Sequence, residues 1–274
     1  MISFITTGRD DDYGGGGNFL DRLYISLSKN IEILERFNVE YEYLVVEWSP
    51  IKNYLINNEK FRQLFLNKNL IDVVVKSNVA VSENLNSNKF FEYFAKNVGV
   101  RISKYEVLIL LNSDIIIPPE TMREIINLFH EKHDEKHFYR LINRVQIDIN
   151  LNILKRECIH YPNNPDAIIC GYCSGDILII NKNFFIESGD GYDETNMGHR
   201  VTSQTGMDGE ILWNLHHKGI TLMFLQADYW HINHSKIGVH TDGIYNTNGY
   251  VNKPNWGFIN YPKNIISKKL IEIG

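Results

Sequence analysis

The first half of the chain alternates between the apolar pattern of a buried strand and that of an amphipathic helix. Residues 1–7, "MISFITT", form an apolar run, and residues 18–37 then repeat apolar side chains at helical spacing. Further strands are predicted at residues 41–50, 71–77 and 105–114, and further helices at residues 58–66, 88–104 and 119–133. Right-handed crossovers pair such strands in parallel, so the pattern predicts an α/β domain over residues 1–130.

The second half follows a different order. Predicted strands cover residues 137–150, 175–188 and 220–235, and a predicted helix covers residues 208–219 with Gly219 at its end. The tail from residue 236 to residue 274 is rich in Gly, Asn and Tyr and is predicted to be irregular. We therefore expect one domain over residues 1–274, with a nucleotide-binding half (1–130) and a second half (131–235) that completes the site.

Polar residues follow three of the predicted parallel strands. Thr7-Gly8-Arg9 ends the first, Glu47-Trp48-Ser49 the second, and Asn112-Ser113-Asp114 the fourth. In open parallel sheets, ligands bind outside the carboxyl ends of the strands. We therefore expect these three groups to meet at one edge of the sheet and to form a binding site there.

Composition narrows the class of protein. The chain has 274 residues, 43% hydrophobic and 22% charged, with a formal net charge of −5. This charge disfavours a protein that binds nucleic acid through its phosphates. No apolar run is long enough to span a bilayer, and no signal peptide is recognisable, so we expect a soluble, cytoplasmic protein. Oligomeric state is not predictable from the sequence.

Several motifs, in order, resemble GT-A fold glycosyltransferases of the family-2 type. "GRDDDYGGGG" and "LVVEWSP" resemble the nucleotide-side segments, and "AKNVGVRISKYE" followed by "NSD" resembles the helix and the D-x-D strand end. "YCSGDILIINKNFFIESGDGYDE", "MDGEILWNLHHKG" and "YWHINHSKIG" resemble the acceptor-side, base and late histidine segments. The resemblance implies a three-layer αβα sandwich with a mixed, mostly parallel sheet. It also implies hexose transfer from a UDP-sugar to a hydroxyl of a glycan or glycoconjugate, with residues 131–235 as the acceptor and catalytic half.

The resemblance implies a divalent cation, Mn²⁺ or Mg²⁺, at the end of the fourth strand. Asp114 is the predicted carboxylate ligand, His234 the first choice of imidazole ligand and His231 the second. Asn112 departs from the family pattern, because it replaces the first aspartate with a side chain that hydrogen-bonds a ribose but carries no charge. Alternatively, Asp114 caps the following turn and the histidines are core residues.

Asp208 is the predicted catalytic base of an inverting transfer. It stands at the start of a predicted helix, where the helix dipole keeps a carboxylate ionised. Its alternative role is that of a helix N-cap, and Glu210 is the alternative base. A retaining transferase on the same fold needs no such base, and a non-catalytic module that binds nucleotide-sugars is a further alternative.

The remaining predicted site residues divide between nucleotide and sugar. Predicted nucleotide contacts are Thr7, Arg9, Glu47, Lys96, Asn97, Asn112 and Ser113. Gly175 allows close approach of the backbone to a sugar, and Asp176 is expected to bind sugar or acceptor hydroxyls. For both, ordinary turn chemistry is the alternative. The glycines at residues 14–17 lack the spacing of a phosphate-binding loop and are expected to form a loop over the donor.

Overall fold

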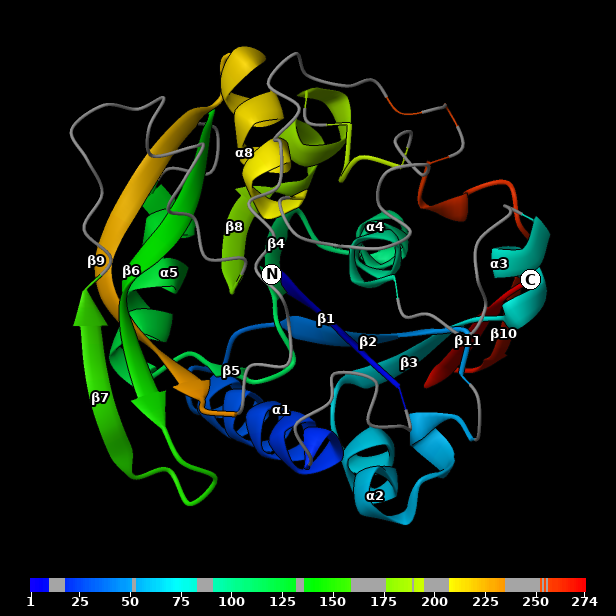
Figure 1. The fold of residues 1–274 in the computed structure, drawn as a ribbon, viewed down its shortest axis with the longest axis horizontal. Helices are drawn as coiled ribbons and strands as arrows, with labels where there is room; N and C mark the ends of the chain where they lie inside the picture. Colours follow the sequence, from blue (N-terminus) through cyan, green and yellow to red (C-terminus); the bar gives the residue numbers. More distant parts are fainter. Residues whose placement is uncertain are drawn as a thin grey trace.

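One mixed sheet runs through the molecule and contains eleven strands among the residues that the structure describes (Figure 1). The structure is a computed structural model. It describes residues 1–9, 18–50, 53–82, 91–131, 136–158, 176–188, 190–194, 207–234, 252, 254 and 256–274. The strand order is β10-β11-β3-β2-β1-β4-β8-β6-β9-β5, with β7 beside β6.

The nucleotide-side half of the sheet is parallel, as the alternation of strands and helices predicted. β1 pairs in parallel with both β2 and β4, and β2 pairs in parallel with β3. The four strands are β1 (Ile2–Gly8), β2 (Tyr41–Trp48), β3 (Leu70–Val75) and β4 (Val107–Leu111). Since β2, β1 and β4 are neighbours, the three predicted polar groups at their carboxyl ends do share one edge of the sheet.

Helices cover both faces of this sheet. Figure 1 shows α1 and α2 on one side and α4 and α8 on the other. Alternate strand residues serve the two sides, so that Phe4 packs in the core beneath α1 while Ile5 packs in the core beneath α4. The helices and helical turns of the first half are α1 (Phe19–Arg36), η1 (Leu55–Asn57), α2 (Glu59–Asn67), α3 (Ser77–Ser82), α4 (Glu92–Ile102) and α5 (Pro119–Glu131). The predicted three-layer αβα sandwich is confirmed.

The second half extends the sheet with strands of both directions. β8 runs antiparallel to β4 and to β6, and β9 runs parallel to β6. The elements are β5 (Ile115–Ile116), β6 (His137–Ile147), β7 (Ile153–Cys158), β8 (Ile177–Asn181), η2 (Phe184–Ser188), α8 (Met207–His217) and β9 (Thr221–Ile232). The strand predicted over residues 175–188 is too long, because the chain turns into the π-helical segment η2 after Asn181.

The prediction that the tail is irregular is wrong for its last part, residues 256–274. η3 (Trp256–Phe258) packs against α4, and the hairpin β10 (Lys263–Ser267) and β11 (Leu270–Ile273) extends the sheet beyond β3. β11 pairs in parallel with β3, with Leu270 opposite Asp72. Among the residues described, no helix is both long and apolar enough to cross a membrane.

Candidate functional site

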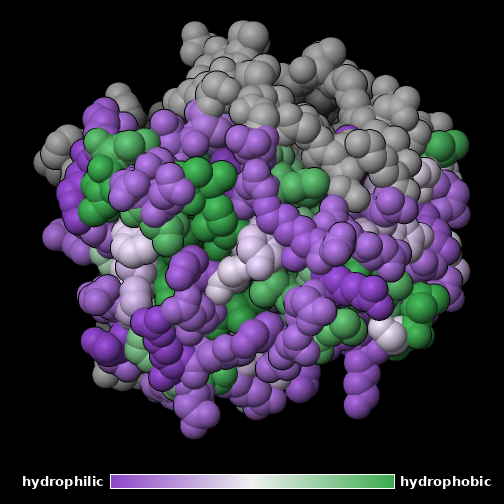
Figure 2. Space-filling model, turned by 90° about the horizontal axis from the view of Figure 1, so that it is seen from below, coloured by the Kyte–Doolittle hydropathy of each residue, from purple (hydrophilic) through white to green (hydrophobic). Residues whose placement is uncertain are grey.

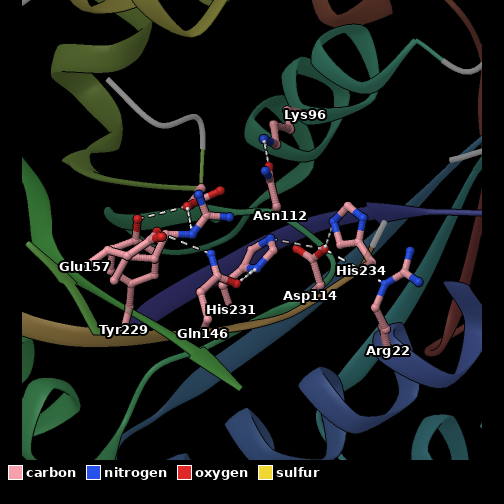
Figure 3. Close-up of polar contacts among 11 residues, drawn as sticks. Arg22, Lys96, Asn112, Asp114, Gln146, Glu157, Tyr229, His231 and His234 are labelled. Carbon is pink, nitrogen blue, oxygen red and sulfur yellow. Dashed lines mark hydrogen bonds and ion pairs between the residues drawn. The ribbon is translucent and has the colours of Figure 1, made fainter. Parts of the chain in front are cut away.

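One strand pairing and one backbone hydrogen bond bring the predicted metal ligands together. β5 pairs antiparallel with β9, which places Ile115 opposite His231. The backbone N–H of Ile232 donates to the carbonyl oxygen of Asp114 at 3.0 Å, which fixes the turn that carries this aspartate. β9 ends at Ile232, and His234 follows two residues later. The register of the sheet thus places Asp114, His231 and His234 at one point (Figure 3).

The three side chains present their ligand atoms to a common centre. The Oδ2 atom of Asp114 lies 3.1 Å from Nε2 of His234 and 3.6 Å from Nε2 of His231. The candidate ligand atoms all lie within 4.8 Å of one another. Asp114 and His231 are buried, whereas the His234 side chain is 26% exposed. One carboxylate and two imidazoles suit Mn²⁺ and other divalent first-row metals, and Mg²⁺ accepts the carboxylate more readily than the imidazoles.

The electrostatics of this group also favour a cation. Burial acts to raise the pKa of Asp114, but the hydrogen bond from His234 and the charges of His231, His234 and Arg22 outweigh it and lower the pKa. Burial lowers the pKa of His231, against the attraction of Asp114. The carboxylate is therefore ionised and the His231 imidazole neutral near pH 7, and these are the forms that bind metals.

Arg22 was not predicted and belongs to the same group. It lies on α1, is 5% exposed, and its Nε atom is 4.0 Å from Oδ2 of Asp114. Its signal in the sequence is its position, one residue before Leu23 and three after Phe19, on the apolar face of the helix. An arginine on the buried face of an amphipathic helix indicates a charged partner inside the protein.

A pocket of about 230 Å³ opens beside His234, between α1 and the turn that joins β6 to β7. Figure 2 views the molecule from this lower side, where hydrophobic side chains lie among hydrophilic ones. The residues that line the pocket are Asn18, Arg22, Asp148, Ile149, Leu154, Ile232, Asn233 and His234. The pocket gives a ligand access to the partly exposed imidazole of the group.

Asn112 and Lys96 meet next to Asp114, as Figure 3 shows. The Nζ of Lys96 donates to Oδ1 of Asn112 at 2.9 Å and pairs with Oε1 of Glu92 at 2.8 Å. Lys96 is 1% exposed. The bond occupies the oxygen of the Asn112 amide and leaves its N–H groups to donate to a ligand. Ser113, half-buried, follows in the same turn.

The other predicted nucleotide contacts are buried. Thr7 and Arg9 lie at the carboxyl end of β1 at 2% and 3% exposure. Glu47 accepts a hydrogen bond from the Leu55 N–H at 2.6 Å and is fully buried. Asn97 binds the turn at residues 192–194 with both its amide nitrogen and its amide oxygen. Glu47 and Asn97 thus support the loops around the edge in this structure.

Asp176, the predicted contact of sugar hydroxyls, lies beside β4 in the structure, where its carbonyl oxygen accepts from the Asn112 N–H at 2.9 Å. Its Oδ2 atom accepts from the Tyr229 hydroxyl at 2.8 Å and lies 3.4 Å from Nε of Arg144. Asp208 is the second residue of α8, and its side chain lies outside the described part. Gly175 and the glycines at residues 14–17 also fall outside the described residues.

Sequence reasoning also missed Arg144, Gln146 and Tyr229. Arg144 and Gln146 stand two residues apart on β6, on either side of Val145, and Tyr229 stands two residues before His231 on β9. Polar side chains two residues apart point to the same face of a strand. This two-residue spacing is the sequence signal from which these residues could have been predicted, and it marks the face of β6 and β9 that lies toward the site.

No family model matches the sequence, and no curated protein matches it. Among solved structures, the chain resembles S. aureus TarS 1–349 in complex with UDP-GlcNAc, with a TM-score of 0.56 and 12% identity over 85% of this chain and 59% of that chain. TarS 1–349 without a named ligand gives a TM-score of 0.52 and 13% identity over 84% and 60%. The complex with UDP gives 0.51 and 12% over 85% and 60%.

This chain therefore spans about 60% of the length of the TarS 1–349 chains that it matches. At 13% identity or less, the likeness concerns the fold. The mixed sheet with helices on both faces matches a GT-A-type fold, as the sequence motifs predicted.

Proposed function

We propose that this protein transfers a sugar from a UDP-sugar to a hydroxyl group of a glycan or glycoconjugate. The observation that carries the proposal is the convergence of Asp114, His231 and His234 at the carboxyl edge of a GT-A-type sheet. The solved TarS structures with UDP and with UDP-GlcNAc support a UDP-sugar as the donor. The transferred sugar is proposed to be a hexose.

A divalent cation held by Asp114, His234 and His231 would offset the negative charge of the departing diphosphate. Mn²⁺ is the proposed ion and Mg²⁺ the alternative. Asn112, held by Lys96, offers amide N–H groups toward the ribose. Thr7, Arg9 and Ser113 are the proposed further contacts of the nucleotide. Glu47 and Asn97 support this side by holding the segments around residues 55 and 192–194.

Asp208 is the proposed base of an inverting transfer. It would accept the proton of the acceptor hydroxyl as the new bond forms at the anomeric carbon and the bond to UDP breaks. Asp176 is the proposed contact of sugar hydroxyls, and the bonds from Tyr229 and Arg144 hold its carboxylate in one orientation. Gly175, immediately before it, is proposed to allow close approach of the sugar.

The decisive experiment measures UDP release from a panel of UDP-sugars, with and without Mn²⁺ and a broad panel of acceptors. We expect turnover that requires both the metal and one acceptor class. Asp208→Asn is expected to abolish transfer and leave UDP binding nearly unchanged, while Glu210→Gln, in the same helix turn, serves as its matched comparison. If only Glu210→Gln abolishes transfer, Glu210 is the base.

The product and the binding data separate the alternatives. An α-linked product from a UDP-α-sugar would show a retaining transferase. Donor binding without turnover across the whole panel would instead show a non-catalytic module that binds nucleotide-sugars, which the neutral Asn112 is compatible with. Absence of any UDP-sugar binding would refute the proposed function.

A further inference from the structure

Gln146 contacts the rear of the His231 imidazole, the side away from the candidate cation site. β6 and β9 pair in parallel with Gln146 directly opposite His231. The Oε1 atom of Gln146 lies 2.9 Å from Nδ1 of His231. On its other side, the amide nitrogen of Gln146 donates to Oε2 of Glu157 on β7 at 3.4 Å. Figure 3 shows this sequence of side chains leading to Asp114.

Glu157 decides which way the Gln146 amide points. The Nζ of Lys155 binds Oε1 of Glu157 at 2.8 Å, and this hydrogen bond is the main cause that holds the pKa of Glu157 below its ordinary value. An ionised carboxylate only accepts hydrogen bonds, so it binds the NH₂ side of the amide. The amide oxygen is therefore directed at His231. The reverse orientation would place two oxygen atoms in repulsive contact.

An amide oxygen also only accepts, so Nδ1 of His231 must carry a hydrogen. In a neutral imidazole the other nitrogen, Nε2, then has a lone pair and no hydrogen. This Nε2 faces Oδ2 of Asp114 at 3.6 Å. Two acceptors that face each other at this distance repel unless a cation lies between or beside them. The hydrogen bonds at Nδ1 thus leave the lone pair of Nε2 available to bind a metal ion.

We propose that Gln146, oriented by Glu157, is a positioning residue that holds His231 in the Nδ1–H tautomer and so presents Nε2 to a divalent cation shared with Asp114 and His234. The inference rests on the metal site of the proposed function but not on the transfer reaction. Partners of this kind behind a metal-bound histidine orient the ring, and their loss weakens metal affinity about 10–100-fold. Gln146 differs from a carboxylate partner in being neutral.

The test is titration of the full chain with Mn²⁺, followed by calorimetry or by the EPR signal of the free ion. Gln146→Leu removes the acceptor and is expected to weaken Mn²⁺ binding about 10–100-fold. The double variant Gln146→Glu/Glu157→Gln keeps an acceptor behind Nδ1 and a donor at position 157, and is expected to stay within about threefold of the parent. Gln63→Leu, the same exchange on α2 where Gln63 binds Asn67, is the matched control and should not change affinity.

A second readout does not depend on metal affinity. The ¹⁵N shifts of the His231 ring in the metal-free protein, assigned with a His231→Gln variant, report which nitrogen bears the hydrogen. We expect the Nδ1–H form in the parent and a mixture of tautomers in Gln146→Leu. An Nε2–H form in the parent, or Gln146→Leu with unchanged Mn²⁺ affinity, would overturn the proposal.

The two proposals fail separately. Mn²⁺ binding that depends on Gln146, without turnover of any UDP-sugar, would leave the positioning role standing and remove the transferase. Turnover of a UDP-sugar by a protein that binds no divalent cation would do the reverse. Thermal unfolding of each variant identifies those that have lost the fold, and for these the double variant Gln146→Glu/Glu157→Gln supplies the comparison that retains the acceptor.

Discussion

Two buried carboxyl groups, Glu47 and Asp72, hold the turn η1 against the sheet. Glu47 accepts from the Leu55 N–H at 2.6 Å, and Asp72 accepts from the Ile56 N–H at 3.0 Å. Both side chains are fully buried, and they also hydrogen-bond each other. Two adjacent carboxyl groups cannot both ionise cheaply in such a place, so the pair retains one proton.

The stability of the protein should therefore fall as pH rises. Burial raises the pKa of Asp72 from 3.8 to about 7, and the hydrogen bond with Glu47 and the one from the Ile56 N–H only partly oppose it. Below pH 4 both the folded and the unfolded chain hold this proton, and its contribution to folding is complete. Between pH 4 and pH 7 only the folded chain holds it, so the contribution is lost progressively. At about 1.4 kcal/mol for each pH unit, the full loss is up to about 4 kcal/mol, of which about 3 kcal/mol falls between pH 5 and pH 8.

Asp72→Asn should remove this dependence. The amide oxygen still accepts from the Ile56 N–H, and the amide nitrogen donates to Glu47 without a titrating proton. We expect the variant to match the parent at pH 5 and to exceed its free energy of unfolding by up to about 3 kcal/mol at pH 8. Urea unfolding followed by tryptophan fluorescence at pH 5, 6, 7 and 8 measures the difference, and other titrating groups cancel between the two proteins.

Asp148→Asn is the matched control. Hydrogen bonds from Asn152 and Asn150 hold the pKa of Asp148 below its ordinary value, so this group titrates below the window. Its difference from the parent should be the same at every pH from 5 to 8. The reasoning about Asp72 is refuted if the difference between Asp72→Asn and the parent is also constant within about 0.5 kcal/mol, or if the variant is the less stable protein at pH 8.

Two further predictions concern the metal group and the tail. Asp114→Asn should weaken UDP binding only when Mn²⁺ is present, and calorimetry with and without EDTA tests this; equal weakening in EDTA would assign Asp114 a structural role. Gly257→Ala should lower the free energy of unfolding by about 1–3 kcal/mol, because Gly257 has a φ of 66° and an added Cβ would lie 2.6 Å from Cγ of Arg101 and 2.9 Å from the carbonyl oxygen of Asn97. Gly219→Ala, with a φ of 81° but no atom within 4 Å of the added Cβ, should cost only about 1 kcal/mol in the same urea experiment.

The sequence predicts those parts of the fold in which local pattern and burial agree. The strands β1 to β4 are fully or almost fully buried apolar runs, and α1 and α5 are amphipathic, so the local pattern predicts both kinds of element. The local pattern does not predict the strands β7 and β10, because their residues are mostly exposed and show no alternation. β11 is a strand because it pairs with β3, almost two hundred residues away, and no local pattern encodes that partner.

The candidate site shows the same division. Asp114, His231 and His234 were predicted by motif order, and the structure brings them together. Arg22 and Gln146 were not predicted, since each contacts the group from a distant part of the chain. A helix of residues 19–36 and a strand of residues 137–147 are easily predicted as elements. Packing and strand register determine which of their side chains faces Asp114, and neither can be predicted from a single sequence.

Register on β9 is what makes one site from these separate parts. Tyr229 and His231 lie on one face of the strand, where Tyr229 binds Asp176 and His231 lies between Gln146 and Asp114. A slip of β9 by one residue would turn Trp230 and Ile232 toward these polar groups and take His231 away from them. The apolar side chains of Ile147 and Ile232, opposite each other in the β6–β9 pair and both in the core, oppose that slip. Ala227 and Tyr229 are buried on the same face as His231, and the burial of this face therefore fixes the position of the metal ligand.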